Sequence, residues 1–533
     1  MFIQGSNLHE MTYGQLIAEA KLCAVFLQQR GLKRGDRVLI ALPQSISVLV
    51  SFLGCLYAGG VAVLANPPIF ANQAKRTFLI IQDADPTFII ANTSTIRIMQ
   101  KYEADYVKQL MKYEYVDLQQ IQQAQGELAW VPPEQSDIAF LQYTSGSTGN
   151  PKGVIIDHGN LAANLTYFAI GDRVTKESNV VSWLPLTHDM GLIGTSLSTL
   201  YVGAQLIFMS PVEFLGRPLL WLETITKYRA THTCAPNFAY ALCVSAASKL
   251  PAVDYLDLSS LISMASGSET VRAETLRQFT ETFKPARFNP DTLIPGYGMA
   301  ETTLVVTREQ HGNLTVLHSD AQDSTYNKNG LVSCGLRYSN EEVIIVDLDT
   351  RCEKEPGGVG EIWVRGPSVS RGYWNKPEET KETFAAYLAD GRGPFLRTGD
   401  LGLVNEAQQL FFIGRIKDVI IIHGKNYAPQ DIEETVETCS DLILPNQTIA
   451  FSIDHNNEEQ LVCVVELRES IPKQEKDELI QIIKRKILME HSLVVFDIRL
   501  CQPGSIPKTT SGKLQRQLCK QKYLSGEYPE TFV

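Results

Sequence analysis

Short apolar runs alternate with segments of helical periodicity through the first half of the chain, and this alternation constrains the fold most. The runs that we interpret as buried strands lie at 37–42, 87–91, 138–143, 205–209 and 263–265. The helical segments lie at 12–30, 160–168, 218–228 and 239–248. Strands that are apolar on both faces and separated by helices are typical of parallel sheets with helices on each side. The sequence therefore predicts an α/β fold with a large N-terminal domain of parallel sheets and flanking helices.

The pattern changes after Pro295, where short strands are separated by Gly and Pro turns. We expect strands at 343–347, 361–365 and 410–413, within a small β-rich subdomain at 305–413. The N-terminal domain as a whole is predicted to span 1–414. A small α+β domain is predicted at 415–533, with strands at 419–422, 448–452 and 461–465 and helices after Pro429 and at 473–490.

The segment from Val48 to Ala65 contains 18 residues without a charge, which is the lower limit for a membrane-spanning helix. Gly59 and Gly60 interrupt it, however, and prolines flank it on both sides. We therefore interpret the segment as a buried helix, a Gly turn and a buried strand.

The composition argues against several classes of function. The formal net charge is -11, whereas nucleic-acid binding normally requires a basic surface. The 10 cysteines are scattered without a C-x-x-C pair, so neither a zinc site nor a disulfide framework is predicted. Residues 1–13 lack the basic and apolar regions of a signal peptide. We therefore expect a cytoplasmic protein that is not an integral membrane protein.

A loop rich in glycine and hydroxyl residues directly follows the strand that ends at Tyr143, and its sequence is Thr144-Ser145-Gly146-Ser147-Thr148-Gly149-Asn150-Pro151-Lys152-Gly153. Backbone N–H groups and hydroxyls of such a loop converge on phosphate oxygens, and Lys152 adds a positive charge. The loop is not a Walker A motif, because no Ser or Thr follows the lysine and a strand rather than a helix comes next. Taken alone, the same composition also suits a surface loop that binds nothing.

Four further motifs follow along the chain. They are Gly296-Tyr297-Gly298-Met299-Ala300-Glu301, Arg397-Thr398-Gly399-Asp400, Gly414-Arg415-Ile416-Lys417-Asp418 and Pro507-Lys508-Thr509-Thr510-Ser511-Gly512-Lys513. Together with the loop they resemble, in order and over nearly the whole chain, the signature motifs of adenylate-forming enzymes. That superfamily includes acyl-CoA synthetases, amino-acid adenylation domains, luciferases and fatty acyl-AMP ligases. The resemblance implies that a carboxylate and ATP give an acyl-adenylate and pyrophosphate, and that a mobile C-terminal domain rotates between two half-reactions.

The resemblance also implies a nucleotide site. Thr144, Ser145, Gly146, Ser147, Thr148, Gly149 and Lys152 are expected to hold the β- and γ-phosphates of ATP. The remaining nucleotide-binding candidates are Ser266, Gly267, Ser268, Gly296, Tyr297, Gly298, Met299, Asp400, Arg415 and Lys417. Among these, Tyr297 would offer a flat face to adenine and Asp400 would accept hydrogen bonds from the ribose hydroxyls. Lys417 matches the pivot of the domain rotation.

The candidate catalytic residues are Lys513, Glu301, Thr144 and Lys152. Glu301 is the expected oxygen ligand of Mg²⁺, which prefers carboxylate, phosphate and water oxygens. Lys513 matches the C-terminal catalytic lysine of the superfamily, which would neutralise the charge that develops at the α-phosphate and the substrate carboxylate. ATP and Mg²⁺ are therefore the predicted cofactors.

Several segments resemble fatty acyl-AMP ligases specifically, at 185–194, 210–221, 236–240 and 424–433. Enzymes of that branch pass the acyl group to the phosphopantetheine thiol of an acyl carrier protein. The fatty acid is then expected near His188, Asp189, Met190, Phe238 and Tyr240. The two aromatic residues, Phe238 and Tyr240, suit plain core packing equally well.

Two departures from the branch are visible. The stretch 305–331 is shorter than the insertion that usually follows the adenine motif, which leaves a fatty acyl-CoA synthetase as the alternative function. Residues 1–16 already match the first tyrosine-containing helix of the family, so the preceding segment is expected to be missing or trimmed. A catalytically inactive relative is a third reading, but it would have lost the phosphate loop, Glu301, Asp400 or Lys513, and all of these are present.

Overall fold

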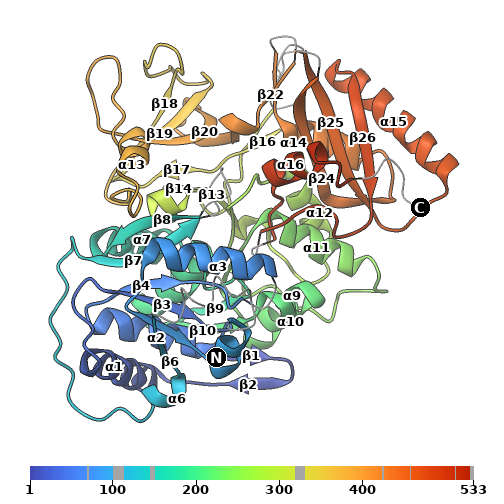
Figure 1. Ribbon diagram of the computed structural model, residues 1–533. Coiled ribbons are helices and arrows are strands. Elements are labelled where there is room, and N and C mark those ends of the chain that lie inside the picture. The colour runs from blue at the N-terminus through green and yellow to red at the C-terminus, as the bar shows by residue number, and fades with distance from the viewer. Residues whose placement is uncertain are drawn as a thin grey trace.

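A computed structural model describes residues 1–68, 71–99, 113–144, 151–318, 330–422, 425–455, 458–509 and 512–528. Two large, mainly parallel sheets with flanking helices form the N-terminal part, and a small α+β unit forms the C-terminal part, which confirms the predicted fold class (Figure 1). The C-terminal sheet and helix α15 (Lys473–His491) lie at the upper right of Figure 1, above α11 (Asn237–Ala247) and α12 (Ala273–Phe283).

The first sheet has the strand order β6-β5-β3-β4-β7-β8. Its strands are β3 (Arg37–Ala41), β4 (Val61–Leu64), β5 (Phe88–Ala91), β6 (Glu114–Val116), β7 (Ile138–Thr144) and β8 (Lys152–Asp157). The accompanying helices are α1 (Tyr13–Gln29), α2 (Ile46–Tyr57), α3 (Ala71–Ala84), α4 (Thr93–Met99) and α6 (Leu118–Ile121). All neighbours are parallel except β7 and β8, which pair antiparallel. The phosphate loop joins these last two strands.

The apolar segment 48–65 folds as the sequence predicts. Helix α2 ends at Tyr57, Gly59 turns the chain with a φ of 80°, and β4 enters the sheet at Val61. Only glycine adopts this φ without strain. In the part of the chain that the structure describes, no helix combines the length and the apolarity that crossing a bilayer requires.

The second sheet has the order β17-β14-β13-β12-β11-β9-β10-β1-β2. Its central strands are β9 (Asn179–Ser182), β10 (Gln205–Met209), β11 (His232–Ala235), β12 (Ser263–Ser266) and β13 (Leu293–Tyr297), which run parallel to one another. The outer strands are β1 (Phe2–Gln4) and β2 (Asn7–His9) at one end and β14 (Thr307–Arg308) and β17 (Leu336–Arg337) at the other, so β2 and β17 are the two edges. Besides α11 and α12, the region contains α7 (His158–Gly171), α8 (Ser198–Val202), α9 (Pro211–Gly216) and α10 (Leu219–Tyr228). A π-helix, η1 (Met190–Leu197), precedes α8.

The β-rich region is an antiparallel sheet of β18 (Glu342–Val346), β19 (Gly360–Arg365), β20 (Leu396–Val404) and β21 (Leu410–Arg415), with helix α13 (Pro377–Phe384) beside it. The short strands β15 (Val316–Leu317) and β16 (Leu331–Val332) pair separately. Two 3-10 helices, η2 (Pro290–Thr292) and η3 (Ala300–Thr302), flank β13.

The C-terminal unit begins with η4 (Ile416–Asp418) and the hairpin of β22 (Ile420–Ile422) and β23 (Lys425–Tyr427). Its main sheet contains β24 (Ile443–His455), β25 (Glu458–Leu467) and β26 (Val495–Cys501). Besides α15, its helices are α14 (Pro429–Glu437) and α16 (Arg516–Leu524). Arg272, at the start of α12, reaches across to Glu437 of α14 at 2.7 Å, so the two parts of the chain are joined by a buried ion pair.

Candidate active site

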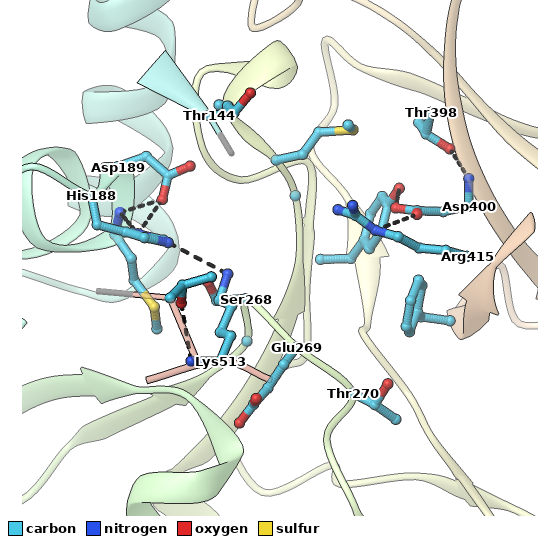
Figure 2. Close-up of a pocket in the computed structure, with 18 of the residues that line it drawn as sticks. Thr144, His188, Asp189, Ser268, Glu269, Thr270, Thr398, Asp400, Arg415 and Lys513 are labelled. Carbon is cyan, nitrogen blue, oxygen red and sulfur yellow. Dashed lines mark hydrogen bonds and ion pairs between the residues drawn. The ribbon is translucent and has the colours of Figure 1, made fainter. Parts of the chain in front are cut away.

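A cavity of about 1290 Å³ lies between the carboxyl end of the second sheet, the β-rich sheet and the C-terminal unit (Figure 2). Of the predicted site residues that the structure describes, all except Tyr240 line it. The cavity lies where the rule for parallel α/β sheets places ligands, beyond the carboxyl ends of the strands.

Lys513 enters the cavity from the C-terminal unit. Its Nζ lies 3.4 Å from Nε2 of His188, and Nδ1 of His188 lies 2.6 Å from Oδ1 of Asp189 (Figure 2). Burial lowers the pKa of Lys513, and the carboxylates of Asp189 and Glu269 oppose that shift. Burial also acts on Asp189, but the neighbouring His188 and Lys513 outweigh it and lower the pKa of that carboxyl. The site therefore holds a desolvated cation supported by nearby carboxylates.

Asp400 is buried on β20 and faces Arg415, its partner on β21. The Tyr297 hydroxyl donates to Oδ2 of Asp400 at 2.8 Å, and Arg415 Nε lies 3.5 Å from Oδ1. Oδ1 is buried without a hydrogen-bond partner among the described residues. Burial raises the pKa of Asp400 to about 6, although Arg415 and Tyr297 oppose the shift. A hydroxyl of a bound sugar would supply the missing donor.

The ring of Tyr297 stacks near Phe412, with centroids 6.0 Å apart, and Tyr297 lines the cavity. The neighbouring glycines allow close backbone approach. A Cβ at Gly298 would lie 1.7 Å from the carbonyl oxygen of Leu304, and one at Gly267 would lie 2.9 Å from that of Gly296. Side chains at these positions would displace the backbone that lines the cavity.

Glu301 lies buried in η3 and accepts a hydrogen bond from the Tyr373 hydroxyl at 2.8 Å. Lys152 forms an ion pair with Glu379 and lies 4.9 Å from the centre of the Tyr373 ring. Tyr373 thus contacts both Glu301, the predicted metal ligand, and Lys152, the predicted phosphate-binding lysine. Thr144, at the end of β7, lies in the same cavity. Ser145, Gly146, Ser147, Thr148 and Gly149 lie outside the described residues.

The two aromatic candidates for the fatty-acid pocket both lie on helix α11, but they face different surroundings. Phe238 lines the cavity, and a Cβ at Gly512 would lie 2.6 Å from its ring. Tyr240 is fully buried between Trp221 and Phe279, with ring centroids 5.9 and 5.1 Å away. The expectation that Tyr240 lines the pocket is therefore wrong. Positions two apart on a helix differ by about 200° in direction, so one faces the cavity when the other faces the core.

The sequence reasoning did not single out several side chains that shape the site. Tyr373 and Glu379 hold Glu301 and Lys152, Arg272 joins the C-terminal unit, and Asp172 pairs with Arg308 at the cavity wall. Their partners lie far away in the sequence, so no local motif marks them.

Comparisons with known proteins show the family to which the chain belongs. Residues 2–374 match the family described as AMP-binding enzyme, and residues 417–532 match the family described as Disco-interacting protein 2-like, AMP domain. The chain is 38% identical to the medium-chain-fatty-acid–[acyl-carrier-protein] ligase JamA of Moorena producens, over 98% of this chain and 92% of that protein. It is 36% identical to the long-chain-fatty-acid–AMP ligase FadD26 of Mycobacterium tuberculosis, over 97% and 92%.

A solved structure shares the whole architecture. The fatty acyl-adenylate ligase from Legionella pneumophila, determined in complex with acyl adenylate and pyrophosphate, is 37% identical and superposes with a TM-score of 0.72, over 98% of this chain and 92% of that one. The chain therefore belongs to the fatty acyl-AMP ligase branch of the adenylate-forming AMP-binding enzymes.

Proposed function

We propose that this protein activates a fatty acid with ATP and then transfers the acyl group to the phosphopantetheine thiol of an acyl carrier protein. The observation that carries the proposal is the single cavity in which Lys513, Asp400 and Glu301 meet, although they come from three separate parts of the chain. Adenylation requires the fatty-acid carboxylate and the α-phosphate of ATP to be held in line. In the proposal, Lys513 provides a cation, Asp400 a hydrogen-bond acceptor for ribose, and Glu301 a metal ligand.

In the first half-reaction, an oxygen of the fatty-acid carboxylate attacks the α-phosphorus and the bond to pyrophosphate breaks. Lys513 supplies positive charge beside the carboxylate and the α-phosphate, where negative charge accumulates. His188 contacts the ammonium and Asp189 contacts His188, so both limit where the lysine can lie. Asp400 and Tyr297 hold the nucleoside, which aligns the phosphorus with the carboxylate.

Mg²⁺ is part of the proposal, and the residues fit it. The Glu301 carboxylate faces the cavity with Oε1 held by Tyr373. In the described part of the chain, no cluster of three His, Cys, Asp or Glu side chains could form a complete metal cage. A single carboxylate suits Mg²⁺, because this ion usually keeps several waters and binds substrate phosphates. When bound, Mg²⁺ would neutralise phosphate charge.

In the second half-reaction, a thiolate attacks the acyl carbon, AMP leaves and the thiol proton passes to solvent. The relative JamA, whose name states an acyl-carrier-protein ligase, supports a carrier protein as the acceptor. CoA is the alternative acceptor, because the stretch 305–331 is short for the branch. Residues 319–329 of this stretch lie outside the described structure. Both acceptors present the same phosphopantetheine thiol, so only the product distinguishes them.

The test is a product assay with the purified protein, ATP, Mg²⁺ and a panel of fatty acids. We expect acyl-adenylate to form and to persist in the presence of CoA, and to disappear when a phosphopantetheinylated carrier protein is added. Mass spectrometry identifies both products. Rapid formation of acyl-CoA would instead make the protein a fatty acyl-CoA synthetase, and the absence of any adenylate would overturn the proposal.

A further inference from the structure

The cavity extends away from the nucleotide site along one face of the second sheet. Cys234 pairs with Ala265 and Ala265 pairs with Ile294 across three parallel strands, so these side chains share a face, and all three line the cavity. Gly267 and Gly296 lie two residues further toward the nucleotide on the same face. The three strands thus form the floor of a pocket that leads away from the reacting carboxylate.

Opposite this floor, α7 and η1 form an apolar wall. A Cβ at Gly194 would lie 3.0 Å from Leu304 Cδ2 and 3.5 Å from the Phe168 ring. The pocket is therefore narrow here and is bounded by Leu304, Phe168 and Met190, which suits a hydrocarbon chain.

The far end of the pocket is polar. Ser263 lies four residues before Gly267, which corresponds to about 13 Å along the strand direction. Ser263 Oγ donates to Oδ1 of Asp172 at 2.8 Å, and Nη2 of Arg308 lies 2.5 Å from the same oxygen. The side chains of Asp172 and Arg308 are only 9% and 10% exposed, and both line the cavity. A buried ion pair therefore closes the apolar pocket.

This polar end retains hydrogen-bonding capacity. The hydroxyl of Tyr338 is buried, and its proton has no acceptor among the described residues. Nη2 of Arg308 is already paired with Asp172. The two groups lie together, since a Cβ at Gly171 would be 2.8 Å from both Arg308 Nη1 and the Tyr338 hydroxyl. Burial raises the pKa of Tyr338, so its hydroxyl stays protonated and can donate. The Tyr338 hydroxyl is thus a buried donor without an acceptor in the described part of the chain, and it lies beside the guanidinium of Arg308.

We infer that the far end of this pocket recognises an oxygen at the distal end of the fatty acid, so that the favoured substrates are ω-hydroxylated or ω-oxo acids. A methyl end that reached Tyr338 would leave its buried hydroxyl proton without an acceptor. A second carboxylate fits less well, because Asp172 already balances the charge of Arg308. The inference rests on the proposed function, since it assumes that the carboxylate is activated beside Lys513.

The wild-type protein provides the first test. Pyrophosphate release is measured with straight-chain acids of increasing length, each in methyl-terminated, ω-hydroxylated and ω-carboxylated form. We expect the ω-hydroxy acid to be favoured by about 10-fold in kcat/KM at the lengths that reach the polar end, and no preference for shorter acids. Equal kcat/KM for the methyl and hydroxy forms at every length would overturn the inference. Pyrophosphate release with no acid at all would overturn the proposed function instead.

Two variants locate the effect. Tyr338→Phe removes one donor and keeps the ring, which stacks on Tyr167 with centroids 4.2 Å apart. The double variant Asp172→Asn with Arg308→Met removes the ion pair without leaving an unpaired charge. Both should lose the ω-hydroxy preference while short acids react as before, and Tyr255→Phe, an exposed tyrosine outside the cavity, should retain it. A preference that survives in both variants would contradict the assignment.

Discussion

The ammonium of Lys513 lies 3.4 Å from Nε2 of His188, although 325 positions separate the two residues. Lys513 belongs to the C-terminal unit and His188 lies just before η1 of the N-terminal part. This contact places the lysine in the cavity, at the entrance of the proposed fatty-acid pocket and close to the carboxylates of Asp189 and Glu269. Under the proposed function, this is the arrangement that adenylation would require.

Removal of the lysine should abolish most adenylation. We expect Lys513→Ala to lower the rate of pyrophosphate release by about 100-fold or more, since the variant loses the ammonium proposed to lie beside the developing charge. ATP-pyrophosphate exchange measures this rate. Lys522→Ala is the control, because Lys522 pairs with Glu527 on the surface. A rate close to that of the wild type in Lys513→Ala would refute the assignment.

The ion pair between Arg272 and Glu437 should favour the closed arrangement. Both side chains are largely buried, and Nη1 of Arg272 lies 2.7 Å from Oε2 of Glu437. Breaking a buried ion pair costs about 3 kcal/mol of folding free energy. Arg272→Met should therefore slow adenylation by roughly 10-fold or more and spare transfer from preformed acyl-adenylate. Glu437→Gln should act in the same direction.

The matched control for this pair is Arg277→Met on α12, which breaks only exposed ion pairs with Glu274 and Glu281. Such exposed pairs contribute at most about 1 kcal/mol. Equal losses in both half-reactions for Arg272→Met would show that the residue does not act on the domain arrangement.

Lys417 lies in η4, where the chain passes from the β-rich sheet to the C-terminal unit. Proline restricts φ and removes the backbone donor, so Lys417→Pro should hold the two parts in one arrangement. We expect one half-reaction to be retained far better than the other when pyrophosphate release and thioester formation are measured separately. If both rates fell together, the pivot would lie elsewhere.

Nucleotide binding should weaken in acid through Asp400. Its pKa is raised to about 6 by burial, so the carboxylate is protonated below that pH and loses an acceptor site for ribose. The KM for ATP should rise as the pH falls through about 6. Asp400→Asn should show a raised KM that no longer changes in this window. An unchanged pH profile in that variant would assign the titration to another group.

Glu301 should determine the requirement for Mg²⁺. Glu301→Gln keeps the size of the side chain but removes the charge, so saturation with Mg²⁺ should require a higher concentration and the maximal rate should fall by about 100-fold. Pyrophosphate release measured against MgCl₂ concentration gives both values. Tyr373→Phe, which removes only the hydrogen bond to Glu301, should have a smaller effect in the same direction.

The alternation of strands and helices and the order of the five motifs could be predicted from the sequence. These features are local, since a strand that is buried on both faces requires a run of apolar residues, and glycine is favoured at many of the places where φ is positive or the backbone approaches closely. The segment 48–65 illustrates this, because its apolar composition, its Gly pair and its flanking prolines were enough to predict α2, the turn and β4.

Tertiary structure alone decided which side chains meet. Phe238 and Tyr240 have similar chemistry in one motif, yet only the packing of α11 shows that the first faces the cavity and the second faces the core. The pairs Lys513–His188, Arg272–Glu437 and Arg308–Asp172 join residues from distant segments. Sequence patterns describe neighbours along the chain, whereas these contacts depend on strand register and domain closure, which bring distant residues within a few ångströms.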